Sequence, residues 1–394
     1  MEVKQIYSII NSVSGEVLGK TDIVKDDLTG VVDLGTEIFN QSAVDNYVKS
    51  LVNHIGKVVF VNRPYSGKVP SVLMDAWEFG SVLEKISADV PQAEENDTWN
   101  LTDGQEYKQD VFHKPTVSAK FFNSKVTFEV PVSITERQVK ESFSSAAQLN
   151  GFLSMIYSAV EKSMTIKTDA LVMRTINNMI AETLDADKVK FGWTAATKET
   201  VDYSSASTVR CVNLLKLYND KTGEHLTAAA AITTPDFIRF AAYIMGLYSD
   251  RLQTISTLFN VGGKERFTPK DVLHTVLLSD FAAAAKAYLY ADTFHEDNVL
   301  LPKAETVASW QATGKDYAFE NVSKIEVKSA SGAAISVSGV LGVMFDRDAL
   351  GVTNLDRRVT TNYNAKAEFF NNYYKFDAGY FNDTNENFVV FFIA

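Results

Sequence analysis

The residues that come nearest to a phosphate-binding loop lie in two glycine-containing segments. A phosphate loop needs two glycines separated by four residues and followed by lysine and a hydroxyl residue. Residues 15–21 (GEVLGKT) place only three residues between their glycines, and Gly262-Gly263-Lys264 is followed by Glu265, whose carboxylate would repel phosphate. We interpret the second segment as a flexible turn, and we predict no nucleotide-binding loop.

Side chains that bind metal ions or catalyse proton transfer show no informative spacing. The histidines form no His-x-His or His-x3-His pair; they are His54, His113, His225, His274 and His295. The single cysteine, Cys211, cannot form an internal disulfide, which fits a reducing compartment. Carboxylate pairs such as Asp346 and Asp348 are common in an acidic chain and do not indicate catalysis without a cleft. A metal site built from distant residues stays open, but we predict no catalytic, cofactor-binding or metal-binding residue and no enzymatic activity.

Composition narrows the class of protein further. The chain has 394 residues, of which 46% are hydrophobic and 22% charged, so we expect two or three packed units rather than a disordered or fibrous protein. The formal net charge of -11 disfavours primary affinity for the phosphate backbone of nucleic acid. The sequence contains neither an apolar run of the ~18 residues that a membrane span needs nor a secretory signal.

The most unusual segment is a charged stretch within residues 75–125. Residues 89–110 contain seven acidic residues and one base, Lys108, whereas residues 111–125 contain three lysines and no carboxylate. Few aliphatic residues occur between Pro91 and Gln109, so this part cannot bury a core of its own. Two interpretations stay open: a solvated surface loop, or a long hairpin that is ordered by lying on another subunit.

The elements around this stretch are predicted from hydrophobic periodicity. Residues 126–134 alternate apolar and polar side chains, which predicts a strand with one buried face, and Pro131 on its exposed face indicates an edge strand or a bulge. Apolar residues at steps of three and four predict a spine helix over about 142–183, roughly 60 Å long.

Shorter elements are predicted on either side of these. We predict helices over 41–54, 234–249 and 269–291, and strands over 57–62, 339–345 and 388–393, with a glycine-containing loop over 256–267. The strand over 388–393 is apolar throughout, which suits a strand that is covered on both faces. We expect the C-terminus to join the spine unit, with residues 207–330 inserted between them.

The order of these parts resembles that of the major capsid proteins of tailed bacteriophages, whose Hong Kong 97-type fold also occurs in encapsulin shells. Two local stretches are similar to this family: residues 126–143 (VTFEVPVSITERQVKESF) and residues 343–383 (VMFDRDALGVTNLDRRVTTNYNAKAEFFNNYYKFDAGYFND). The resemblance covers nearly the whole chain.

The resemblance implies an α+β protein with the phage major capsid fold. It implies an N-terminal arm (1–55), the first part of a peripheral domain (56–74), an extended β-hairpin loop (75–125), a peripheral domain with the long spine helix (126–206), an axial domain (207–334) and a C-terminal return to the peripheral domain (335–394). The implied function is self-assembly, through hexamers and pentamers, into the icosahedral or prolate head shell that encloses the genome of a tailed phage.

In this family the extended loop reaches over a neighbouring subunit, and the axial domains meet at the centre of the capsomer. The contact residues expected on the extended loop are Glu94, Glu95, Asp97, Trp99, Asp103, Lys108, Lys114 and Lys120, and those on the axial-domain loop are Asn260, Gly262, Gly263 and Lys264. Some members are joined covalently through a lysine of the extended loop, but no lysine here matches such a motif.

The resemblance also implies partners. They are further copies of the chain, portal and scaffold proteins, and packaged double-stranded DNA bound without sequence-specific contact; a decoration protein is compatible, and neither a membrane nor a cofactor is expected. The chain begins at Met1, so we expect no N-terminal scaffold segment to be removed and a separate scaffold protein, or none, to serve. The expected location is the virion, after assembly in the cytoplasm of the host bacterium. An encapsulin-type compartment and a soluble enzyme remain the alternative functions.

Overall fold

A computed structural model describes most of the chain from residue 69 onward. The described residues are 11–12, 69–74, 83–88, 90–91, 93–107, 110, 112–135, 146–193, 195–197, 200–201, 203–204, 206–290, 304–311 and 316–394. The N-terminal arm, the helix predicted over 41–54 and the strand predicted over 57–62 lie outside the described residues.

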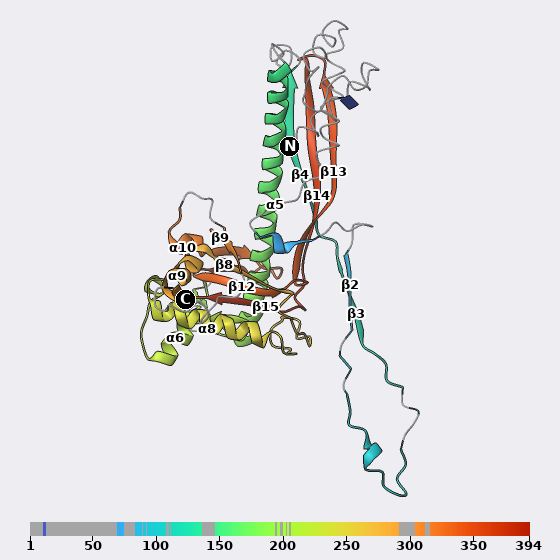
Figure 1. The fold of residues 1–394 in the computed structure, drawn as a ribbon, viewed down its shortest axis with the longest axis vertical. Helices are drawn as coiled ribbons and strands as arrows, with labels where there is room; N and C mark the ends of the chain where they lie inside the picture. The colour runs from blue at the N-terminus through green and yellow to red at the C-terminus, as the bar shows by residue number, and fades with distance from the viewer. Residues whose placement is uncertain are drawn as a thin grey trace.

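The first unit is a sheet packed along one very long helix. The sheet has the order β1-β13-β14-β4, formed by β1 (Leu73–Met74), β4 (Lys125–Thr135), β13 (Leu350–Asn364) and β14 (Phe369–Asn382). The helix α5 (Ala146–Phe191) has 46 residues, about 69 Å at 1.5 Å per residue, and runs along the sheet (Figure 1). Val160 and Met164 of α5 pack against Tyr374 and Phe376 of β14. The predicted spine helix is therefore confirmed, and it extends eight residues beyond the predicted end.

The alternating strand is also confirmed. From residue 125 to residue 134 of β4, the apolar side chains at every second position are buried or half-buried, and the side chains between them, including that of Pro131, are exposed. Within the described residues β4 pairs only with β14, so Pro131 lies on an edge strand, the place in a sheet where proline is tolerated.

The second unit is a five-stranded sheet that is covered on both faces. Its order is β7-β15-β12-β8-β9, from β7 (Cys211–Asn213), β8 (Leu273–Leu278), β9 (Glu305–Val307), β12 (Val340–Asp346) and β15 (Phe388–Phe392). Successive side chains of β15 enter different cores: Phe388 packs in the core that includes the C-terminal part of α5, and Val389 packs in the core that includes the helix α8 (Pro235–Arg251). This arrangement explains why the strand is apolar at every position.

Two predictions need correction. The helix predicted over 269–291 is the strand β8 followed by the helix α9 (Ser279–Tyr290), because residues 273–278 (LHTVLL) form an interior strand of the five-stranded sheet, between β12 and β9. Residues 335–394 do not all return to the spine unit: β13 and β14 do, whereas β12 and β15 join strands from residues 207–334. The physical reason is the pattern of burial, because β14 alternates as a one-sided strand does, whereas β12 and β15 are buried throughout.

The remaining described elements are short. They are the 3-10 turns η1 (Pro70–Val72) and η2 (Asp97–Trp99), the helices α6 (Leu214–Thr222), α7 (Ala228–Ala231) and α10 (Phe319–Val322), and the strands β5 (Ala195–Thr197), β6 (Thr200–Val201), β10 (Ile325–Lys328) and β11 (Ala334–Val337). Pro235 opens α8 at its first turn, as predicted.

A long hairpin leaves this body where the two units meet. Its strands β2 (Leu83–Ala88) and β3 (Val117–Phe122) pair antiparallel, and the residues between them extend as an open loop away from both sheets (Figure 1). The hairpin points in the direction opposite to the N-terminal end of α5.

Candidate functional site

The far end of the hairpin, residues 90–116, exposes every side chain that the structure describes there. Trp99 is 94% exposed and Phe112 is 86% exposed. Indole and phenyl rings left in water lose the free energy that burial would provide, so a concentration of exposed aromatic rings marks a surface that another molecule covers. We call residues 90–116 the hairpin tip.

The tip holds most of the residues that sequence analysis singled out. Glu94, Glu95, Asp103 and Lys114 are exposed there, like Trp99. Asp97 lies in η2, and Lys108 lies outside the described residues. The described polar contacts of the tip are local: for example, the Thr102 backbone N–H donates to the Tyr107 hydroxyl over 3.0 Å.

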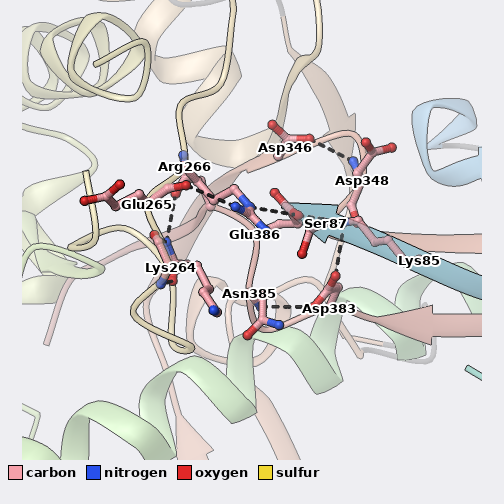
Figure 2. Close-up of polar contacts among 12 residues, drawn as sticks. Lys85, Ser87, Lys264, Glu265, Arg266, Asp346, Asp348, Asp383, Asn385 and Glu386 are labelled. Carbon is pink, nitrogen blue, oxygen red and sulfur yellow. Dashed lines mark hydrogen bonds and ion pairs between the residues drawn. The ribbon is translucent and has the colours of Figure 1, made fainter. Parts of the chain in front are cut away.

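The base of the hairpin, in contrast, is bound tightly to the body. The register places Lys85 of β2 directly opposite Lys120 of β3, an arrangement in which two like charges repel. The carboxylate of Asp383, in the turn between β14 and β15, forms an ion pair with each of these lysines. Its Oδ2 lies 3.0 Å from Lys85 Nζ and its Oδ1 lies 3.0 Å from Lys120 Nζ. Figure 2 shows Lys85 reaching this turn. We call the contacts of Lys85 and Lys120 with this turn the clasp.

The electrostatics of Asp383 follow from this geometry. Burial favours the neutral carboxyl, but the charge of Lys85 and hydrogen bonds from the Asn385 backbone, Lys120 and Lys85 outweigh burial and lower the pKa of Asp383. The carboxylate is therefore ionised at neutral pH although its side chain is only 3% exposed.

Glu386 extends the clasp to the loop over residues 256–267. Its Oε1 lies 2.8 Å from Lys85 Nζ and 3.2 Å from Arg266 Nε (Figure 2). The backbone of Arg266 is itself fixed by reciprocal hydrogen bonds with Ser256, of 3.0 and 3.1 Å. An aromatic contact adds to the polar ones, because the ring of Phe122 lies 5.1 Å from that of Phe381. The base of the hairpin is thus held by both polar and apolar contacts.

The structure changes the interpretation of the expected axial-loop contacts. The side chain of Asn260 is buried and bonds within its own loop, donating to Lys264 O over 2.7 Å and accepting from Lys264 N over 2.8 Å. Gly262 N donates to Thr384 O over 2.8 Å, and a Cβ at Gly262 would lie 2.0 Å from Asn385 Oδ1. Asn260 and Gly262 therefore hold the loop against its own chain, and contact of this loop with another subunit stays a prediction.

Gly263 and Lys264 complete this turn. Gly263 has a φ of 64°, which glycine adopts without strain, and it is exposed. Lys264 is half-buried. Lys120, for which we expect a contact with a neighbouring subunit, also takes part in the clasp of its own chain, and the expected contact stays a prediction.

A buried ion pair joins the end of α5 to the same loop. Arg210 donates through Nε to Asp187 Oδ1 over 3.1 Å, and its Nη1 donates to the backbone carbonyl of Asn260. Asp187 also accepts from the hydroxyl of Thr208. Burial is the main reason why the pKa of the neighbouring Cys211 thiol is raised, so this thiol stays protonated. The loop that carries Arg266 is therefore connected through side chains to the spine helix.

Sequence analysis missed Lys85, Asp383 and Glu386. A polar run between two apolar strands, residues 382–387 (NDTNEN), predicts a turn, but nothing local indicates its partner. Lys85 and Glu386 are separated by 301 positions in the sequence.

The part of the chain that the structure describes contains neither a metal-binding cluster nor a membrane-spanning helix. No group of three or more His, Cys, Asp or Glu side chains there is placed to hold a metal ion. Among the described helices, none has an apolar stretch that would cross a bilayer.

Comparison with known proteins points to one family. The chain matches the family model of the Phi29-like phage major capsid protein over residues 6–392. It is 23% identical over 187 residues to the major capsid protein of Bacillus phage B103, and the match takes in 46% of this chain and 40% of that protein. The chain thus spans about two fifths of the length of the curated relative that it matches.

Solved structures resemble the fold at low sequence identity. A chain from the structure of the head fiber and inner core protein gp22 of native bacteriophage P68 has a TM-score of 0.50 at 8% identity, covering 85% of this chain and 86% of that chain. A chain from the capsid structure of Staphylococcus phage Andhra has a TM-score of 0.49 at 8% identity, with the same coverage. At 8% identity, the similarity to the phage P68 chain shows a shared fold and nothing further.

Proposed function

Because the chain belongs to the Phi29-like phage major capsid protein family, we propose that it is the repeating subunit of the shell that encloses a phage genome. The family match over residues 6–392 is the observation that carries this proposal. The α+β architecture, with a spine helix, a second sheet unit and a projecting hairpin, supports it.

The hairpin is the element that we assign to contact between subunits. A tip that exposes Trp99 and Phe112 gains free energy when a neighbouring molecule covers these rings. The outer face of the hairpin strands adds exposed apolar side chains, including Ile86 and Phe121. We therefore propose that the tip of each subunit lies over a neighbour within and between hexamers and pentamers.

The clasp fixes the direction in which the tip is presented. Because Lys85 and Lys120 are both bound to Asp383, the base of the hairpin cannot turn without breaking two ion pairs. A fixed base reduces the entropy that is lost when the tip binds, and this strengthens each weak contact. Many weak contacts made together then stabilise a closed particle.

The remaining partners follow from the family. We propose a portal, a scaffold protein and packaged double-stranded DNA as partners, a structural role without enzymatic activity, and assembly in the host cytoplasm before incorporation into the virion. The net charge of -11 supports this, because it keeps free subunits apart and disfavours adhesion of DNA to the shell.

Negative-stain electron microscopy of the purified protein, combined with sedimentation velocity, tests the proposal. We expect closed particles, formed with the scaffold protein of the same phage where that protein is required. A chain that stays monomeric across protein concentration, salt and added scaffold would contradict the shell function. Particles that enclose an enzyme instead of DNA would indicate an encapsulin-type compartment.

A further inference from the structure

The loop over residues 256–267 connects two charged clusters that lie far apart in the sequence. On one side, Arg266 Nε and Lys85 Nζ both contact a single carboxylate oxygen, Oε1 of Glu386, over 3.2 and 2.8 Å (Figure 2). Because one oxygen accepts both cations, a shift of Arg266 changes the position that Lys85 prefers. The base of the hairpin is therefore sensitive to the position of this loop.

On its other side the loop is bound to the C-terminal end of α5. Arg210 donates to the backbone carbonyl of Asn260 and, through Nε, to Asp187 Oδ1 over 3.1 Å. The side chains of Arg210 and Asp187 are 7% and 0% exposed. Water cannot take the place of either partner at such burial, so this contact fixes Asn260 relative to the helix.

Within the loop, hydrogen bonds join these two sides. The buried side chain of Asn260 bonds to the backbone N and O of Lys264, over 2.8 and 2.7 Å, and Arg266 follows two positions later. Ser256 and Arg266 close the loop at its base with two backbone hydrogen bonds, of 3.0 and 3.1 Å. A displacement at Asn260 is therefore carried to Arg266 instead of being absorbed by a flexible segment.

The chemistry of the Asp187–Arg210 pair favours a positional role over a stabilising one. Burying two charges costs about as much free energy as their attraction returns, so apolar side chains of similar volume stabilise a core at least as well. A guanidinium and a carboxylate, unlike two apolar groups, bond only in a defined relative orientation. Such a pair suits a contact whose geometry has to be kept.

We propose that the loop over residues 256–267 couples the base of the hairpin to the C-terminal end of α5, so that the clasp and the Asp187–Arg210 pair loosen together. A molecule that turns the hairpin then loosens the end of the spine helix, and a change at the helix end reaches the hairpin. Linkage requires such coupling to act in both directions. The inference concerns the free chain and does not rest on the proposed function.

The single cysteine provides a native probe at the helix end. Cys211 follows Arg210, is buried, and its Sγ lies 3.7 Å from the backbone O of Thr183 in α5. A thiol reagent reacts with this side chain only when the region opens. We expect Asp383→Asn, which weakens the clasp, to accelerate labelling of Cys211 by about fivefold or more. The measurement uses the full-length chain below the concentration at which it assembles.

Denaturant separates this local opening from global unfolding. Labelling through global unfolding accelerates steeply with urea, whereas labelling through a local opening is nearly independent of urea well below the unfolding midpoint. Val160→Ala is the control, because Val160 packs on Tyr374 and Phe376 in a separate core. At low urea we expect this variant to be labelled at the wild-type rate. Equal labelling of Val160→Ala and Asp383→Asn there, or no acceleration in Asp383→Asn, would overturn the coupling.

Removing the middle of the connection should uncouple its two ends. In an Arg266→Met background, Glu386 keeps its contact with Lys85 but loses its contact with the loop. We therefore expect Asp383→Asn to accelerate labelling of Cys211 by less than about twofold in this background. An undiminished acceleration would show that the clasp does not act through Arg266, and it would overturn the inference.

A second cation near the loop provides the matched control for this background. Lys270 lies three positions beyond the loop, and its ion pair with Asp250 is exposed and outside the connection. We expect the effect of Asp383→Asn on labelling to persist in full in a Lys270→Met background. Equal loss of the effect in the Lys270→Met and Arg266→Met backgrounds would contradict the assigned route.

The reverse direction gives an independent readout. We expect Asp187→Asn to accelerate hydrogen exchange of residues 83–88 and 117–122 by about fivefold or more. Since this change leaves Arg210 buried without its carboxylate and can prevent folding, Thr208→Val serves as the milder variant, because it removes a hydroxyl that donates to Asp187. Wild-type exchange of both strands in a folded Thr208→Val chain would overturn the coupling and leave the shell function standing.

Discussion

Lys85 and Lys120 lie directly opposite each other across the hairpin strands, and both form ion pairs with the one carboxylate of Asp383. Two lysines in register repel each other unless an anion lies between them. The pairing of β2 with β3 at the hairpin base therefore depends on a residue that comes from the turn between β14 and β15.

Replacing the shared carboxylate should loosen the base without unfolding the body. We expect Asp383→Asn to lower the free energy of unfolding by about 1–2 kcal/mol, less than the ~3–5 kcal/mol of a fully buried pair, because the two lysines are 22% and 38% exposed and can turn to water. Hydrogen exchange of residues 83–88 and 117–122 should become faster. Asp348→Asn, the same change at an exposed neighbouring position, is the control; equal exchange in both variants would contradict the clasp.

A double-mutant cycle should reverse the sign of one substitution. In the wild type Lys120→Met removes an ion pair, and we expect it to destabilise the protein by about 0.5–1 kcal/mol. In the Asp383→Asn background the same change removes a repelling charge opposite Lys85, so it should be neutral or stabilising. Chemical denaturation of the four proteins measures the coupling, and additive effects would show that the two residues act independently.

The clasp should also give the protein a defined dependence on pH. The pKa of Asp383 is lower in the folded chain than its ordinary value of 3.8, because the lysines and hydrogen bonds outweigh burial. Its stabilising contribution is therefore full above about pH 5 and is lost as the pH falls through the lowered pKa. The difference in unfolding free energy between wild type and Asp383→Asn should be constant from about pH 5 to 7 and shrink below about pH 4. A difference that grew on acidification would contradict this assignment.

Shortening the tip should separate folding from assembly. Deletion within residues 91–109 leaves β2, β3 and the clasp in place, so we expect a soluble subunit with unchanged thermal unfolding that closes no shells. A second variant, with the tip replaced by a Gly-Ser segment of the same length, keeps the reach but lacks Trp99 and the acidic residues. It should fail in the same way, and normal particles from either variant would refute the role of the tip.

The apolar part of the buried face of α5 should tolerate no unpaired charge. Ile176 is fully buried in the core, and we expect Ile176→Asp to destabilise the subunit by several kcal/mol, about the scale of an unpaired buried charge. Ile166, 65% exposed on the same helix, gives the control, because Ile166→Asp should change stability by less than about 0.5 kcal/mol. Similar melting temperatures for the two variants would mean that the buried face is assigned wrongly.

Several elements could be predicted from the sequence because their causes are local. The alternation over 126–134 reports that one face is buried, and the three- and four-residue spacing of the spine reports a helix with one apolar face. The apolar run over 388–393 likewise reports a strand covered on both sides. Periodicity gave the wrong element at residues 273–278, because a short apolar run is equally compatible with a helix or a strand. This segment is a strand because it pairs with β12 and β9 in the five-stranded sheet.

The amino-acid sequence by itself determined the acidic hairpin, the long helix, the edge strand with Pro131 and the family. Only the tertiary structure decided that Asp383 lies between Lys85 and Lys120, that Asn260 is buried in its own loop, and that β15 lies beside β7 rather than in the spine sheet. The physical reason is distance along the chain. Local patterns fix which face of an element is buried, but contacts between elements separated by hundreds of residues depend on how the whole chain packs.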